Sequence, residues 1–160
     1  MDTLKIASGL VLLAGLALIA AVAIVLVFPP AAPAPEALGE PTIIINIFGG
    51  ETKEVFGFAL EEHGEIMSPG PEIKVKVGDV VKIVFKNIGS IPHTLTVLVD
   101  KREDAQVLFG ATIGTASRPI ESGKTGSVVF KPNRAGVYYY GCVVPNHINL
   151  GMWGVLRVES

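Results

Sequence analysis

The 160-residue sequence contains few of the residues that usually crosslink small domains or bind metal clusters. It has one cysteine, three histidines and three methionines. A single cysteine cannot form a disulfide within the chain, so the fold has to rest on a packed core. It also cannot supply a zinc site that needs several cysteines.

Charged residues are scarce as well. They make up 18% of the chain, below the roughly 25% of average soluble proteins. The formal net charge is −2, and no acidic or basic block stands out. Because nucleic-acid binding relies on clustered lysine and arginine, nucleic acid is not an expected partner.

One long apolar run accounts for part of this deficit. It extends from Ile6 to Phe28 without a charge, and as a helix it would be about 34 Å long. A bilayer core is roughly 30 Å thick, so residues 1–28 are predicted to be a transmembrane anchor. The run exceeds the apolar region of about 7–15 residues in a cleaved signal peptide. Cleavage and a buried core helix remain the alternatives.

The distribution of basic residues predicts how this anchor is oriented. Lys5 precedes the run, and the first basic residue after it is Lys53. The positive-inside rule then places the C-terminal domain on the extracytoplasmic side of the cell membrane. Residues 29–41 (PPAAPAPEALGEP) are rich in proline and predict a semi-rigid linker.

Residues 42–160 contain short β-branched runs separated by turn residues, which predicts an all-β sandwich or barrel of about eight strands. The expected strands are 42–48, 53–60, 72–77, 80–86, 93–100, 127–131, 137–142 and 153–158. Residues 101–123 alternate poorly and predict a loop with a short helical turn. His63, in a charged stretch, is interpreted as part of a solvated turn, with a second metal site as the alternative.

Four metal-binding side chains occur in a suggestive order. Cys142, His147 and Met152 follow one another with four residues between successive members, and His93 precedes them in a separate expected strand. Two imidazoles, a thiolate and a thioether are the ligand set of type 1 copper, with methionine as a weak axial ligand. Strand alternation points Cys142 inward and Tyr139 outward, where Tyr139 packs or meets a partner.

The segment from Gly136 to Gly154, GVYYYGCVVPNHINLGMWG, resembles the ligand loop of cupredoxins, most of all rusticyanin and sulfocyanin. The resemblance covers residues 72–158 and implies a cupredoxin-like Greek-key sandwich after the N-terminal helix. It implies one copper ion bound by His93, Cys142, His147 and Met152. Rusticyanin-like proteins usually have glycine before the second histidine, where this chain has Asn146.

The resemblance also implies roles for residues around the ligands. Thr94 and Pro145 are expected beside them, with Thr94 near the cysteine sulfur. Cupredoxins pass electrons through an apolar patch around the C-terminal histidine. Four residues are expected to form this patch, with a core position as their alternative: Val143, Val144, Ile148 and Leu150.

These features predict a membrane-anchored carrier of single electrons between respiratory-chain components on the outer face of the membrane. Its expected partners are redox proteins such as a cytochrome or a terminal oxidase. All four copper positions would be filled by protein, so neither a small-molecule substrate nor enzyme activity is expected. The alternatives are a copper-delivery protein without a redox role and a metal-free adhesion domain. A multicopper enzyme would need further histidines, and only His63 is left.

Overall fold

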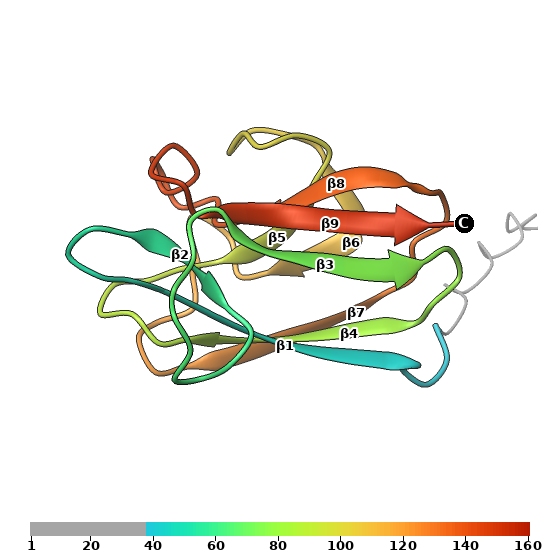
Figure 1. The fold of residues 1–160 in the computed structure, drawn as a ribbon, viewed down its shortest axis with the longest axis horizontal. Coiled ribbons are helices and arrows are strands. Elements are labelled where there is room, and N and C mark those ends of the chain that lie inside the picture. The colour runs from blue at the N-terminus through green and yellow to red at the C-terminus, as the bar shows by residue number, and fades with distance from the viewer. Residues whose placement is uncertain (1–37) are drawn as a thin grey trace, which may run out of the picture. The chain divides into compact units, whose positions relative to one another are not determined.

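A computed structural model describes residues 38–160, which form two β-sheets packed face to face (Figure 1). Within this range, no helix has the length and apolarity that a membrane span requires. The predicted anchor at 1–28 and most of the predicted linker lie outside the described residues. The expectation of an all-β sandwich is confirmed for the part described.

The first sheet has four strands in the order β2-β1-β4-β7. Their bounds are Ile43–Glu51 for β1, Phe56–Ala59 for β2, Val81–Asn87 for β4 and Thr125–Phe130 for β7. β1 and β4 run parallel, and the other neighbours are antiparallel. Because β1 and β4 run parallel, their last residues lie at the same end of the sheet, next to the site described below.

The second sheet has five strands in the order β3-β9-β8-β5-β6. Their bounds are Gly70–Lys76 for β3, Leu95–Leu98 for β5, Val107–Ile113 for β6, Gly136–Gly141 for β8 and Trp153–Glu159 for β9. β3 and β9 run parallel, and the remaining neighbours are antiparallel. β8, which leads into the predicted ligand loop, lies between β9 and β5 and is therefore hydrogen-bonded on both sides.

Alternating apolar residues from both sheets fill the space between them. In β4 every second side chain is buried, and Phe85 has no exposed surface. The Phe85 ring lies edge-on to Phe58, which in turn lies 5.1 Å from the Tyr140 ring between centroids. Tyr138, Tyr140 and Cys142 all belong to this core, as the alternation in their strand predicts.

The structure has nine strands where the sequence predicted about eight, because β6 lies inside the expected loop 101–123. The difference has a local cause. Phe109 and Gly110 have positive φ angles of 56° and 66°, and they interrupt the alternation between buried Leu108 and buried Ala111. Because of this two-residue irregularity, the sequence does not show the alternation of apolar and polar residues from which a strand is predicted.

β1 is also longer than expected, since it continues through Gly49 and Gly50 to Glu51. The glycine pair predicted the end of a strand. In the structure these glycines instead allow close packing: a Cβ at Gly49 would lie 2.5 Å from the Phe85 ring. A Cβ at Gly50 would lie 2.8 Å from the backbone nitrogen of Gly89.

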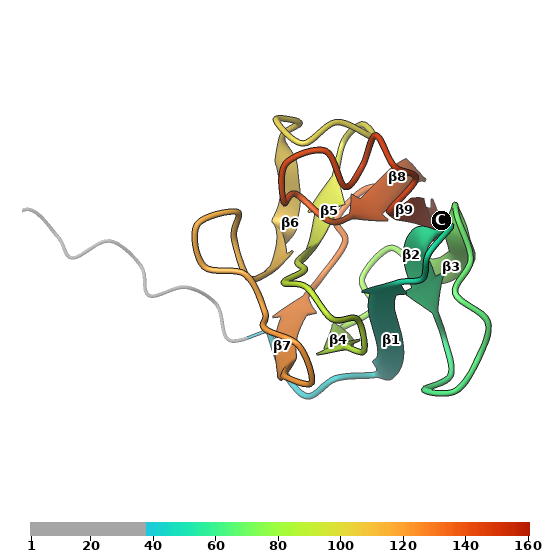
Figure 2. The same cartoon turned by 90° about the vertical axis from the view of Figure 1, so that its left-hand side faces the viewer.

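Three loops meet at one end of the sandwich, at the left in Figure 1 and facing the viewer in Figure 2. They are the loops β1–β2, β4–β5 and β8–β9. The first two meet because β1 and β4 are parallel neighbours, and the third joins them because β8 and β5 pair across the opposite sheet. All four predicted copper ligands lie in or next to these loops.

Candidate metal centre

Three donor atoms from two separate loops converge at this end of the sandwich. The sulfur of Cys142 lies 3.2 Å from Nδ1 of His147 and 3.8 Å from Nδ1 of His93. The two Nδ1 atoms are 3.2 Å apart. Among the described residues, this is the group of side chains whose donor atoms are close enough to share a metal ion.

These separations fit a shared metal ion. Nitrogen and sulfur ligands bind metals such as zinc at about 2.0–2.3 Å, which places ligand atoms around one ion roughly 3.3–3.8 Å apart. His93 and Cys142 have no exposed surface, and His147 is 6% exposed. A buried thiol facing two imidazoles is a soft donor set of the kind that selects copper.

The fourth predicted ligand, Met152, is fully buried in the same core as Cys142. Backbone hydrogen bonds fix its place relative to the other two loop residues. The amide of Cys142 donates to the carbonyl of Met152 (3.1 Å), and the amide of Met152 donates to the carbonyl of His147 (3.0 Å). These hydrogen bonds tie the two ends of the predicted ligand loop to each other.

Thr94 places two hydrogen-bond donors close to the sulfur of Cys142. Its backbone amide lies 3.2 Å from the sulfur and its hydroxyl 3.7 Å. The same hydroxyl oxygen accepts a hydrogen bond from the amide of Val143 at 2.8 Å. Thr94 thus links the β4–β5 loop to the ligand loop, next to the sulfur as expected. Pro145, the other residue expected beside the ligands, is exposed.

A carboxylate that the sequence did not reveal binds the outer nitrogen of His93. Oε2 of Glu51 lies 2.6 Å from Nε2 of His93. Oε1 of Glu51 accepts hydrogen bonds from the backbone amides of Ser90 (2.7 Å) and Ile91 (3.3 Å) and from the Ser90 hydroxyl. Burial opposes ionisation, but hydrogen bonds from Ser90 and His93 outweigh it and lower the pKa of Glu51 to about 2.

Burial keeps the other ionisable groups of the site neutral. It lowers the pKa of His93, although Glu51 acts in the opposite direction. Burial and the neighbouring His93 lower the pKa of His147. Burial also raises the pKa of the Cys142 thiol, against the hydrogen bonds from Thr94. Neutral imidazoles are ready to bind a metal, whereas the thiol has to lose its proton when the metal enters.

Asn146, which replaces the glycine usual in rusticyanin-like proteins, has a positive φ of 71°. This left-handed conformation favours glycine, and asparagine is among the few other residues that adopt it readily. Asparagine is therefore compatible with the backbone conformation that the loop has here. It adds an exposed polar side chain next to His147.

The four residues of the predicted electron-transfer patch differ in exposure. Leu150 is 53% exposed, whereas Ile148 is only 4% exposed and packs with Leu98. Val143 and Val144 are half-buried. The expectation that Ile148 is a surface residue is wrong, because its side chain belongs to a small buried apolar cluster.

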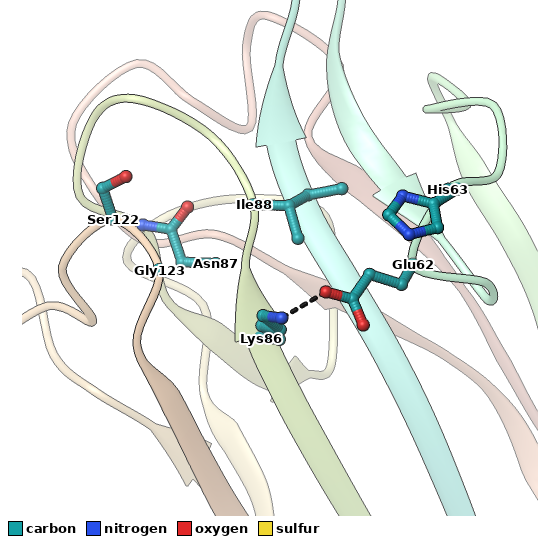
Figure 3. A pocket seen from close by; sticks show the side chains of 7 residues that line it. All are labelled: Glu62, His63, Lys86, Asn87, Ile88, Ser122 and Gly123. Atoms are coloured by element: carbon teal, nitrogen blue, oxygen red, sulfur yellow. Dashed lines mark hydrogen bonds and ion pairs between the residues drawn. The ribbon is translucent and has the colours of Figure 1, made fainter.

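His63 lies away from this centre. Figure 3 shows it beside Glu62 at an open pocket, where the Glu62 carboxylate pairs with Lys86. Within residues 38–160, His63 belongs to no group of three metal-binding side chains, and it is exposed. These observations favour the solvated turn over a second metal site.

Comparison with known proteins decides the family. The sequence profile described as "Sulfocyanin (SoxE) domain" matches residues 39–160. The chain belongs to the sulfocyanin family of cupredoxins. This match confirms the resemblance stated above, and it makes the chain a cupredoxin-type copper protein whose His–Cys–His site is consistent with one type 1 copper ion.

Solved structures support the same fold. Rusticyanin from Thiobacillus ferrooxidans superposes with a TM-score of 0.58 at 19% identity, covering 75% of this chain and 79% of that one. Auracyanin B gives a TM-score of 0.58 at 18% identity, covering 76% and 92%. The multicopper oxidase mgLAC gives 0.55 at 30% identity, covering 73% and 38%.

Some relatives in sequence are enzymes. Copper-containing nitrite reductase from Neisseria meningitidis is 33% identical over 96 residues, which are 57% of this chain and 23% of that protein. The same enzyme from Rhizobium sullae is 33% identical over 94 residues, or 56% and 23%. The match thus spans about a quarter of the length of these relatives.

Proposed function

We propose that this protein carries single electrons, by cycling one copper ion between Cu(II) and Cu(I) at the site formed by His93, Cys142, His147 and Met152. The observation that supports this most is the buried donor set. Three donor atoms lie within 4.8 Å of one another, and Met152 is fully buried in the same core as Cys142. The copper ion supplies a one-electron couple, and the protein holds its ligands.

The chain's own contribution is a site that resists rearrangement. His93 is fixed by Glu51, the sulfur of Cys142 by Thr94, and the ligand loop by its internal backbone hydrogen bonds. Ligands held in this way change little when the metal changes charge, which lowers the reorganisation that accompanies electron transfer. Four protein ligands also leave no open position for a substrate, which argues against catalysis at this metal.

The first test is the visible absorption spectrum of the whole chain loaded with Cu(II), beside a Cys142→Ala variant. We expect an intense blue or green band that requires the thiolate and therefore disappears in the variant. His63→Ala is the matched control, because it removes the one histidine that lies outside the site, and its spectrum should be unchanged. A wild-type protein that takes up no copper would refute the proposal.

Redox cycling separates the carrier from a copper-delivery protein. We expect the copper-loaded protein to be reduced and reoxidised repeatedly without loss of metal, because both histidines and the cysteine are buried. A delivery protein needs an exchangeable site and should lose Cu(I) to a competing chelator within a few cycles. That result would support the delivery function instead.

The proposal extends to location and partners. The apolar run Ile6–Phe28 would anchor the copper domain to the outer face of the cell membrane, and the proline-rich residues 29–41 would separate the two. A cytochrome or a terminal oxidase of the respiratory chain would then be the partner. Deletion of residues 6–28 should move the protein from the membrane fraction to the soluble fraction. If the deleted form remains with membranes, the anchor is elsewhere.

A further inference from the structure

Glu51 is the one carboxylate that contacts a predicted copper ligand in the described residues. We propose that Glu51 is a positioning residue for His93. It holds the proton of that imidazole on Nε2, leaves Nδ1 free for copper, and through its charge favours Cu(II) over Cu(I). The inference rests on the proposed function for its redox part, whereas the effect on His93 can be measured without metal.

The geometry fixes which nitrogen carries the proton. Oε2 of Glu51 is 2.6 Å from Nε2 of His93, and an ionised carboxylate can only accept a hydrogen bond. Nε2 must therefore be the donor, and in a neutral imidazole Nδ1 then keeps its lone pair. Nδ1 is the atom that faces the sulfur of Cys142 and the ring of His147.

The other carboxylate oxygen, Oε1, also accepts hydrogen bonds, and these oppose rotation of the Glu51 side chain away from His93. Its Oε1 receives three donors, which are the amides of Ser90 and Ile91 and the Ser90 hydroxyl. The side chain is only 12% exposed. Charge-assisted hydrogen bonds of this kind are roughly twice as strong as neutral ones, and here they hold one end of the carboxylate while the other end meets His93.

The β4–β5 loop is shaped around this carboxylate. A Cβ at Gly89 would overlap the Glu51 side chain, so only glycine fits there. The buried side chain of Asn87 braces the same loop: its Nδ2 donates to the carbonyl of Ile91 at 2.8 Å, and its Oδ1 accepts from the amide of Gly89 at 2.9 Å. The loop therefore presents both the donors for Glu51 and the histidine that Glu51 orients.

The charge of Glu51 should also bias the copper couple. The Cys142 thiolate and the Glu51 carboxylate together carry two negative charges, which balance Cu(II) and leave one excess negative charge with Cu(I). In a buried site such charges are screened weakly. The carboxylate therefore lowers the reduction potential relative to a neutral acceptor at the same position.

Two variants separate the hydrogen bond from the charge. In Glu51→Gln the amide oxygen should take the donors of Ser90 and Ile91, so the NH2 group faces His93 and favours a proton on Nδ1. Glu51→Asp keeps the charge but is one methylene shorter, so it should lose contact with Nε2 and keep most of the electrostatic effect. Glu54→Gln is the matched control, because it removes an exposed charge from the β1–β2 loop, which directly follows Glu51.

The first measurement is ¹⁵N NMR of the imidazoles in the metal-free full-length chain. We expect wild type and Glu54→Gln to show His93 protonated on Nε2. We expect Glu51→Gln to shift the population at least tenfold toward Nδ1 protonation. A wild-type His93 protonated on Nδ1, or an unchanged tautomer in Glu51→Gln, would overturn the positioning role.

The second measurement is the reduction potential of the copper-loaded variants. At a fixed ambient potential, Glu51→Gln should raise the Cu(I) to Cu(II) ratio about tenfold, or about 59 mV for one electron. Glu51→Asp should shift the ratio less than Glu51→Gln, and Glu54→Gln should leave it unchanged. Equal potentials in Glu51→Gln and wild type would overturn the charge effect. If wild type binds no copper, the proposed function fails while the NMR result still decides the role of Glu51.

Discussion

The two loops that carry the site hold their histidines in different ways. His93, in the β4–β5 loop, has no exposed surface and is held by a hydrogen bond from its outer nitrogen to Glu51. His147, in the β8–β9 loop, is 6% exposed and lies against the ring of Phe56, with 5.1 Å between ring centroids. One histidine is thus fixed by a charged partner, and the other by apolar contact and by the backbone of its loop.

This difference suggests a division of roles between the loops. A carboxylate partner sets the tautomer and the electrostatics of a ligand, which suits the side of the site that tunes the metal. A ligand that lies against an aromatic ring and keeps a small exposed surface would suit the side through which the proposed carrier exchanges electrons. The three predictions below test whether the two histidines respond differently.

Lowering the pH should produce the largest change in the free energy of unfolding, because both histidines are buried in the neutral state. Their pKa values in the folded protein lie below the value of about 6.5 in the unfolded chain. As the pH falls through 6.5, the unfolded chain takes up protons first, so the free energy of unfolding of the metal-free protein should fall. Each histidine adds a slope of up to about 1.4 kcal/mol per pH unit. Urea denaturation between pH 7.5 and 5 measures this slope.

Single variants assign the slope to one histidine or the other. His147→Gln should remove about half of it, and His63→Gln, at an exposed position, should leave it unchanged. Glu51 should add a further loss of stability below about pH 4.3, because its pKa falls to about 2 on folding. In the copper-loaded protein His147, as the more exposed ligand, should be released first. A free energy of unfolding that stays constant from pH 7.5 to 5 would contradict neutral, buried histidines.

The sequence was sufficient to predict that the histidines and the cysteine lie together, but not that a carboxylate contacts His93. The Cys142–His147–Met152 spacing lies within one loop, so local sequence carries it. Glu51 meets His93 only because β1 and β4 are parallel neighbours, and pairing between distant strands leaves no local pattern. The glycines before Glu51 also predicted that the strand had already ended.

The same limit explains the other differences in the fold. β6 was predicted as a loop because the positive φ angles at Phe109 and Gly110 break its alternation. Ile148 was predicted at the surface because loop residues usually are exposed, yet the β8–β9 loop folds back over Leu98 and buries it. Periodicity identifies strands and inward faces, but it does not describe how a loop packs against its neighbours.

Removal of the Phe56 ring should affect the His147 side of the site more than the His93 side. Phe56 is half-buried, so Phe56→Ala should lower the free energy of unfolding by about 2 kcal/mol, less than the 3–5 kcal/mol of a fully buried ring. Water should then reach His147, and the copper band should be lost at a higher pH than in wild type. Urea denaturation and an acid titration of the visible band measure the two effects.

A conservative variant separates packing from aromatic character at this position. Phe56→Leu keeps most of the apolar volume, so both its stability and its acid titration should stay close to those of wild type. If Phe56→Ala and wild type lose the copper band at the same pH, Phe56 does not protect His147. The two histidines would then differ only in the Glu51 contact.

The smallest effect is expected at Asn146, which tests whether backbone conformation alone positions His147. Its φ of 71° costs an ordinary residue about 1–2 kcal/mol, so Asn146→Ala should destabilise the metal-free protein by about 1 kcal/mol. Asn146→Gly adopts this conformation freely and should stay within about 0.5 kcal/mol of wild type. Urea denaturation compares the three proteins, and the visible spectrum reports the geometry of the copper site.

Since the ligand loop is closed by backbone hydrogen bonds, Asn146→Gly should keep the wild-type spectrum. If Asn146→Gly changed the spectrum as much as Asn146→Ala, the asparagine side chain itself, and not the turn it permits, would hold His147 in place.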